Sequence, residues 1–197
     1  MDKVTSTDFK IIEEPGKPLA MHPKKFAMWL FMGSVLMLFA AFTSAYMVRQ
    51  AEGNWLYFEL PSLFTVSTVV IVLSSITMQW AYFAARSNQL ATVRLLLTAT
   101  FAGGLAFMVL QLLGWQQLVG NSVHFVGNPS GSFLYVITGM HGLHIASALV
   151  YLAIVWVASL KITRYAGALA QMEMCTTYWH FLGVLWVYLY VFLLLNR

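Results

Sequence analysis

Charge is scarce in this sequence: Asp, Glu, Lys and Arg make up 9% of its 197 residues, whereas 60% are hydrophobic. Soluble globular domains carry roughly a quarter charged residues, so this composition excludes that class. Five apolar runs reach the length of about 20 residues that a helix needs to cross a bilayer. The alternation of apolar and polar residues that is typical of membrane barrels is absent. The sequence therefore predicts an all-α integral membrane protein, a bundle of five transmembrane helices, with spans at 26–48, 62–83, 95–118, 133–160 and 178–196.

Acidic residues are missing from all five predicted spans. The carboxylates fall in the N-terminal segment or in predicted loops: Asp2, Asp8, Glu13, Glu14, Glu52, Glu59 and Glu173. Proton pumps and cation-coupled transporters normally carry buried acidic or histidine side chains along their pathway. We therefore predict that this chain does not translocate ions by itself.

Cysteine is almost absent as well, because Cys175 is the only one in the chain. We expect it in the loop before the fifth span. A single thiol provides neither a disulfide framework nor a cysteine-based metal site.

The basic residues are sorted by membrane side rather than clustered for nucleic acid, so we expect no nucleic-acid partner. Only Arg49 and Arg197 lie at the ends of spans that face away from the N-terminal segment. The positive-inside bias then puts the N-terminus inside and the C-terminus outside. Residues 1–25 are predicted to be a cytoplasmic tail and residues 26–197 a transmembrane domain. The inner-side basic residues are Lys3, Lys10, Lys17, Lys24, Lys25, Arg86, Arg94, Lys161 and Arg164.

Two histidines, His141 and His144, lie about 60° apart on one face of the fourth predicted span. Gly139, Gly142 and Ala146 lie on roughly the opposite face, where small residues allow another helix to approach. We interpret both histidines as hydrogen-bonded packing residues. Metal or haem binding is the alternative, but no Asp, Glu or Cys accompanies the pair.

The fifth span places Trp179, Gly183, Trp186 and Tyr190 on one helical stripe. An interfacial aromatic belt accounts for Trp179. Trp186 lies deeper, so we expect it to pack against another protein helix or a held lipid. At the inner end of the first span, Lys24 and Lys25 are placed where lipid phosphates would lie.

Several short motifs resemble subunit III of the haem-copper terminal oxidases. They are GMHGLHI at 139–145, YWHF at 178–181 followed by VLWVYLYV, YFELP at 57–61 and LSSIT at 73–77. The similarity runs through residues 22–197. Glu173, seven residues before His180, also falls where many family members carry a glutamate. The length matches the short five-helix form of the family.

The chain departs from that family at three positions. Members often carry membrane carboxylates where this sequence has Val35, Gly114 and Gly183. Any role that depends on those acids therefore does not carry over, whereas a packing role does.

The resemblance implies an accessory subunit without a cofactor of its own, bound beside the catalytic subunit I that holds the haems and copper. It also implies structural phospholipids as partners, contacts with other oxidase subunits, and a multi-pass location in a bacterial plasma membrane. The motif and membrane-surface positions give our candidates for lipid or subunit contact, with no catalytic or metal-binding residue among them. They are Lys24, Lys25, His141, Gly142, His144, Glu173, Trp179, His180, Gly183 and Trp186.

Three other interpretations remain open. The chain could be subunit III of a quinol oxidase of the same family. From other classes, it could be a small transporter, which would need an inverted repeat or a broken helix. It could also be a haem-bearing anchor, which would need histidines at matching depth on facing helices.

Overall fold

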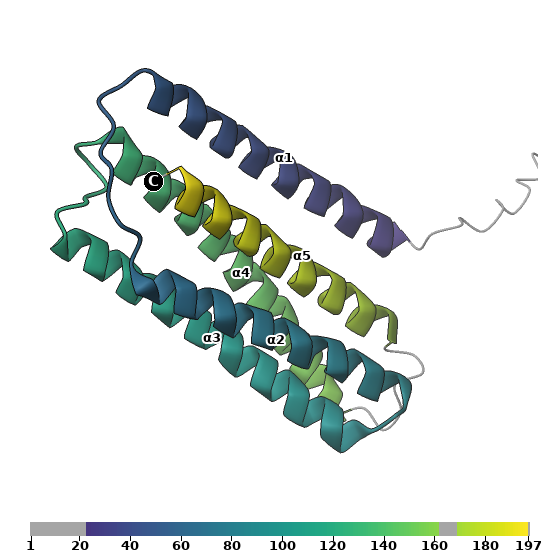
Figure 1. The fold of residues 1–197 in the computed structure, drawn as a ribbon. Helices are drawn as coiled ribbons and strands as arrows, with labels where there is room; N and C mark the ends of the chain where they lie inside the picture. The colour runs from purple at the N-terminus through teal and green to yellow at the C-terminus, as the bar shows by residue number, and fades with distance from the viewer. Residues whose placement is uncertain (1–22, 162–168, 197) are drawn as a thin grey trace, which may run out of the picture.

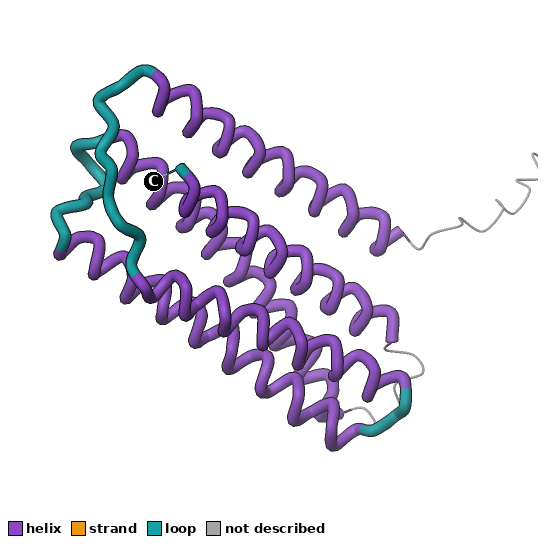
Figure 2. The backbone as a smooth tube through the Cα atoms, in the orientation of Figure 1, coloured by secondary structure: helices purple, strands orange, loops and turns teal. Residues whose placement is uncertain are grey.

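The computed structural model describes residues 23–161 and 169–196, and this part of the chain is helical without any strand (Figures 1 and 2). The five helices are α1 (Pro23–Ala51), α2 (Ser62–Arg86), α3 (Leu90–Gly120), α4 (Pro129–Lys161) and α5 (Leu169–Leu195). Each is long and apolar enough to cross a membrane. The predicted fold class, an all-α bundle with five transmembrane helices, is confirmed. The predicted tail, residues 1–25, lies mostly outside the described residues.

The helix ends follow local backbone chemistry. Pro23 and Pro129 are the first residues of α1 and α4, and Pro61 precedes α2, because proline fits the first turn of a helix, where no amide donor is needed. The short connection between α2 and α3 turns at Asn88, which has a φ of 56°. Asparagine tolerates this left-handed conformation better than most residues.

The start of α5 differs from the prediction. The helix begins at Leu169, nine residues before the predicted span, and it includes both Glu173 and Cys175, which we had placed in a loop. Hydropathy missed this segment because it is polar, yet Ala, Gln, Met and Glu are good helix formers. Cys175 is buried.

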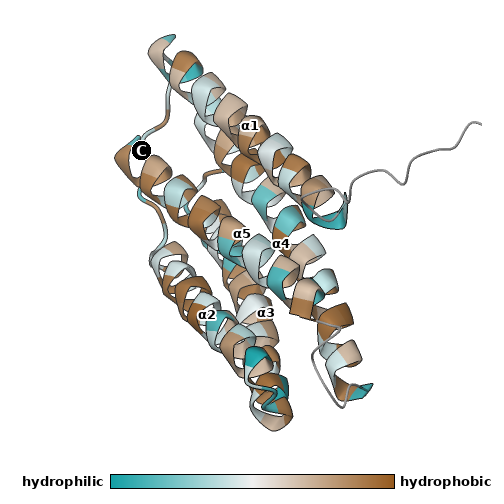
Figure 3. Cartoon of the chain, turned by 90° about the vertical axis from the view of Figure 1, so that its right-hand side faces the viewer, coloured by the Kyte–Doolittle hydropathy of each residue, from teal (hydrophilic) through white to brown (hydrophobic). Residues whose placement is uncertain are grey.

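The helices form a ring of four with a fifth laid against its side. Helices α2, α3, α4 and α5 contact one another in that cyclic order, whereas α1 contacts α4 and α5. In Figure 1, α5 accordingly runs between α1 and α2. The chain ends at the opposite end of the bundle from the start of α1. Hydrophobic colours dominate along the helices in Figure 3, and strongly hydrophilic residues gather at helix ends such as the start of α1.

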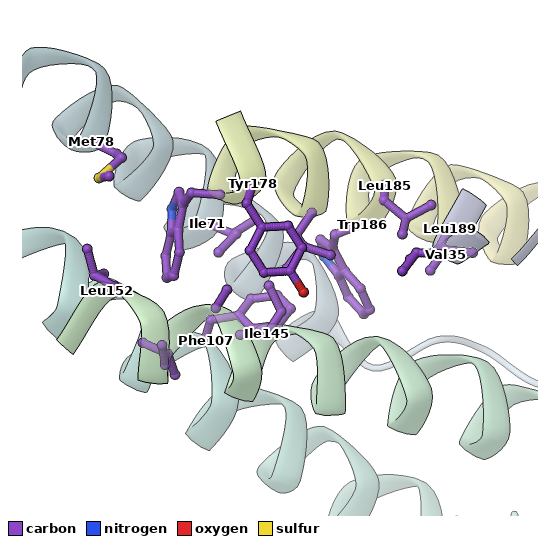
Figure 4. Close-up of a cluster of buried hydrophobic side chains, with 14 of the residues drawn as sticks. Val35, Ile71, Met78, Phe107, Ile145, Leu152, Tyr178, Leu185, Trp186 and Leu189 are labelled. Carbon is purple, nitrogen blue, oxygen red and sulfur yellow. The ribbon is translucent and has the colours of Figure 1, made fainter. Parts of the chain in front are cut away.

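Aromatic side chains fill the centre of the bundle. Trp186 and Phe107 point into the space between the helices in Figure 4, with their ring centroids 5.1 Å apart. Phe64 stacks on the other side of Trp186, with centroids 6.1 Å apart. Such edge-to-face and stacked pairs stabilise a core beyond the area that they bury.

Hydroxyl groups join α2 to α3. Ser74 donates to the carbonyl oxygen of Thr100 (3.1 Å), and Thr77 shares a hydrogen bond with the Thr100 hydroxyl (2.8 Å). Deeper in the pair, the Gln111 amide donates to Ser67 (2.9 Å). These bonds are typical of helices that must associate without a hydrophobic driving force.

Candidate functional site

His141 lies in the centre of the bundle and is completely buried. Its ring lies 5.1 Å from Trp186, 6.0 Å from Phe107 and 6.2 Å from Phe39, measured between ring centroids. Neither ring nitrogen has a hydrogen-bond partner among the described residues. His141 is thus packed among aromatic rings, and the prediction that this histidine is hydrogen-bonded is wrong.

His144 differs from His141 in both position and bonding. Its Nδ1 lies 2.7 Å from the carbonyl oxygen of Met140, so Nδ1 carries the proton and donates. The ring also contacts α1, with centroids 5.7 Å from Phe39 and 6.4 Å from Phe31. His144 therefore donates a hydrogen bond to the backbone of its own helix and packs against α1. Across the described ranges, 23–161 and 169–196, no group of three His, Cys, Asp or Glu side chains could hold a metal ion.

Gly142 does not perform the close packing that the sequence predicted. A Cβ built at this position would meet no atom within 4 Å, and at Gly139 it would meet the ring of Trp115 at an ordinary 3.6 Å. None of the described helices therefore packs so closely that it requires a glycine at position 142. The prediction failed because helical periodicity shows which residues share a face but not what lies opposite that face.

The close approach occurs instead at Gly104 on α3. A Cβ there would lie 2.6 Å from Cη2 of Trp179 and 2.7 Å from Cδ2 of Leu149. Trp179 is accordingly buried in the bundle, and its Nε1 has no hydrogen-bond partner in the described part of the chain. The interfacial-belt interpretation of Trp179 is therefore wrong. The Gly103–Gly104 pair was visible in the sequence, but nothing there distinguished its second glycine from the other small residues.

Trp186 packs within this chain rather than against a lipid. Besides its ring neighbours, it donates from Nε1 to the Thr68 hydroxyl (2.9 Å). The aromatic stripe of α5 thus turns inward over much of its length. This arrangement explains a deep tryptophan without any partner molecule.

Val35, Gly114 and Gly183, the positions where family members often carry carboxylates, are packed against other residues of this chain. Val35 is buried, the ring of Phe64 lies 3.0 Å from where a Cβ of Gly114 would be, and Ser75 Oγ lies 3.0 Å from where a Cβ of Gly183 would be. A side chain at either glycine would require these neighbours to shift by a few tenths of an ångström. All three positions therefore lie in packed parts of the bundle.

His180 lies well inside α5, and its Nε2 lies 2.9 Å from Gln79 Oε1 on α2. The sequence alone could not pair Gln79 with His180, because the two residues lie on different helices. The bond joins residues 101 positions apart in the chain. It lies in the half of the α2–α5 contact that is nearer the end of α2 and the start of α5.

Charged residues gather at the end of the bundle where α1 begins. Lys25 on α1 forms an ion pair with Glu173 on α5, with Nζ 2.6 Å from Oε1. Both side chains are partly exposed, so the pair contributes at most about 1 kcal/mol. At the same end, Arg94 donates to the carbonyl oxygens of Ser159 and Leu160, at 3.2 Å each. A basic group is favourable there because the C-terminus of a helix carries partial negative charge.

The fold brings Lys25 on α1 into contact with Glu173 on α5, and Glu173 and His180 line the same cavity beside α2. His141, Trp179 and Trp186 form part of the core instead. Gly183 packs on α2, and Gly142 and His144 lie on the opposite flanks of α4. The structure therefore divides the candidates into a core group and a group along the surface of α5.

Known proteins are similar to this sequence over most of its length. The family model described as cytochrome c oxidase subunit III matches residues 17–196. Cytochrome c oxidase subunit 3 of Bacillus sp. (strain PS3) is 24% identical over 194 residues, which cover 96% of this chain and 93% of the relative. The probable cytochrome c oxidase subunit 3 of Nocardia farcinica is 30% identical over 172 residues, and that of Mycobacterium tuberculosis (strain H37Rv) is 28% identical. Both alignments cover 82% of each chain.

Proposed function

The chain belongs to the cytochrome c oxidase subunit III family, and on this basis we propose that it is the accessory, cofactor-free subunit of a bacterial respiratory oxidase. In this role the chain stabilises the catalytic subunit and holds structural phospholipids. The family match carries the proposal, since it extends over all five described helices. The chain is a subunit III of a haem-copper oxidase and a multi-pass membrane protein. It is therefore one part of a complex with other subunits.

An architectural role is supported by the chemistry of the interior. The polar groups inside the bundle are hydroxyls, amides, indoles and imidazoles, and the described helices carry their only carboxylate, Glu173, near the start of α5. His141 is enclosed by aromatic rings on three sides, and His144 is committed to a backbone carbonyl. These residues can pack and position helices, whereas a redox centre would need ligands that converge on a common point.

The orientation we propose has the N-terminus of α1 on the cytoplasmic side. Lys24, Lys25, Arg86, Arg94 and Lys161 all belong to the helix ends at that side of the bundle, which fits the positive-inside bias. The location we propose is a bacterial plasma membrane, because the relatives named above are bacterial.

Co-purification tests the function directly. An affinity tag placed after Arg197 should recover, in mild detergent, a complex that contains haem and copper and consumes dioxygen. We propose cytochrome c as its electron donor, since the relatives carry that name. A complex that oxidises quinol but not reduced cytochrome c would assign the chain to a quinol oxidase instead. Recovery of the chain without any haem protein would contradict the proposal.

A further inference from the structure

Two loops meet at the end of the bundle opposite the start of α1. One loop, residues 52–61, joins α1 to α2, and the other, residues 121–128, joins α3 to α4. Figure 2 shows both loops in teal at this end. We refer to the two together as the loop pair.

Asn128 connects the two loops by hydrogen bonds. Its Oδ1 accepts from the backbone amide of Leu56 (3.3 Å), and its Nδ2 donates to the carbonyl oxygen of Asn54 (3.2 Å). Ser130, in the first turn of α4, adds a bond from its hydroxyl to the carbonyl oxygen of Leu56 (2.8 Å). The first loop is therefore held against the start of α4.

Hydrogen bonds from α4 also fix the second loop. The Tyr135 hydroxyl donates to the carbonyl oxygen of Val123 (2.9 Å), and the Ser132 hydroxyl donates to that of Phe125 (2.6 Å). A backbone that is already held in this way loses little conformational freedom when a partner binds. The loop pair is therefore preorganised for binding.

Large apolar side chains are exposed on both loops. Val126 is 80% exposed and Tyr57 is 68% exposed, and Leu56 and Phe125 are exposed as well. A patch of this kind marks contact with another protein or with the membrane. The level of the patch relative to the bilayer decides between the two.

The length of α4 places the second loop outside the hydrocarbon core. Arg94 donates to the carbonyl oxygen of Leu160 and so marks the charged end of the bundle. From Leu160 to Ser132, which bonds to Phe125, the helix runs for 28 positions. This distance is about 42 Å, or about 39 Å at the average tilt of transmembrane helices. The hydrocarbon core is only about 30 Å thick, so the loop lies in or above the headgroup layer, where lipid tails do not cover it.

A small cavity opens between the two loops. It has a volume of about 190 Å³, and its lining includes Leu56 from the first loop and His124 and Val126 from the second. Pockets for small ligands usually occupy about 300–1,000 Å³, so this cavity is smaller than a typical ligand site. Protein interfaces, in contrast, are anchored by single large side chains that fill pockets of the partner. The cavity is therefore suited to one side chain of another protein.

The charges of the loop pair favour a basic partner. Glu52 and Glu59 are its charged residues, and neither loop contains a lysine or an arginine. Arg49, near the end of α1, already forms an ion pair with Glu52 (3.1 Å). Glu59 thus leaves a negative charge on the surface, which an anionic membrane surface would repel. A lysine or arginine of a protein complements it.

We propose that the loop pair is the docking surface for a water-exposed segment of another subunit of the oxidase. One large side chain of that segment enters the cavity between Leu56 and Val126, and apolar residues pack on Tyr57 and Phe125. A lysine or arginine of the segment faces Glu59. The inference rests on the proposed function, which gives the chain partner subunits but no surface that binds them.

The first test places a photocrosslinking amino acid, p-benzoyl-phenylalanine, at position 126 of the chain in the intact complex. Irradiation should join the chain to another oxidase subunit, in a segment outside the membrane that contains a lysine or arginine. The same probe at position 87, in the exposed turn between α2 and α3 at the opposite end, is the matched control and should not label that segment. Labelling of lipid alone, of a second copy of this chain or of no protein would overturn the proposal.

Substitutions then measure the contribution of the apolar patch, as the amount of the crosslinked subunit that stays with the complex per haem after a salt wash. Val126→Lys removes the apolar contact and adds a charge of the partner's sign, so retention should fall roughly tenfold. Val126→Leu keeps the patch apolar and should leave retention unchanged. Glu59→Gln should lower retention about two- to fivefold, because the charge that it removes is exposed to solvent. Equal retention in Val126→Lys and Val126→Leu would overturn the docking surface.

The outcomes separate this proposal from the function on which it rests. A complex that contains haem and consumes dioxygen, but in which the probe at position 126 labels no other subunit, overturns the docking surface and leaves the function intact. A chain that never co-purifies with a haem protein refutes the proposed function instead.

Discussion

A single methyl group added at Gly104 should disrupt the bundle, because this position lies under two side chains at once. The new Cβ would lie 2.6 Å from Trp179 and 2.7 Å from Leu149. Carbon atoms prefer separations of about 3.5–4.0 Å, so the overlap is about 1 Å on each side. The end of Leu149 can rotate, but the ring of Trp179 is enclosed in the core and cannot move without displacing its neighbours.

Overpacking of this kind costs typically about 1–3 kcal/mol, which lowers the ratio of folded to unfolded protein by roughly 5- to 150-fold. Gly142→Ala is the matched control, since a Cβ there meets nothing within 4 Å. Alanine favours a helix over glycine by up to about 1 kcal/mol, so the control should be neutral or stabilising. The assay is unfolding of the purified chain in mixed detergent, followed by helical circular dichroism.

A double-mutant cycle then identifies the cause. Trp179→Phe removes the part of the ring that Gly104→Ala would strike, and it breaks no hydrogen bond of the indole with the described residues. We therefore expect Trp179→Phe to cost less in the Gly104→Ala background than in the wild type, with a coupling energy of about 1 kcal/mol or more. Effects that add within about 0.5 kcal/mol would refute the argument. Equal stabilities of Gly104→Ala and Gly142→Ala would refute it as well.

Four further predictions concern topology, cofactors and the two histidines of α4. A reporter fused after Arg197 should read as external and one inserted in 87–93 as internal, whereas the reverse would overturn the proposed orientation. The chain purified alone should show no haem absorbance band and no stoichiometric metal, and a haem spectrum lost in His144→Leu would instead make it a cytochrome. His141→Leu should leave the free energy of unfolding in detergent almost unchanged, because it replaces unpaired buried nitrogens with apolar atoms. A decrease of more than about 2 kcal/mol in that free energy would show that the imidazole has a polar partner. His144→Leu should still assemble and keep most of the turnover, since its bond to Met140 lies within its own helix.

The sequence by itself determined the helices and their environment. The sequence has five apolar runs of sufficient length, and proline and residues that tolerate turns separate them. In lipid every backbone group must be hydrogen-bonded within its own segment, so these runs must form helices. The HGLH and WHF motifs by themselves indicate the family. The serines and threonines of α2 bond either to α3 or to carbonyl oxygens of their own helix, because a hydroxyl in hydrocarbon needs a partner. The start of α5 was missed, since hydropathy reports on lipid contact and not on helix formation.

Only the tertiary structure decided which residues meet. Most of these helices are apolar on every side, so periodicity could not separate the face toward lipid from the face toward the core. As a result, Gly142 and Gly104 looked alike in the sequence, yet one is open and the other receives a tryptophan. The Lys25–Glu173 and His180–Gln79 pairs join residues 148 and 101 positions apart, and no local pattern encodes such contacts. Composition and spacing fix what each helix needs from its surroundings, whereas the packing of the helices fixes which neighbour supplies it.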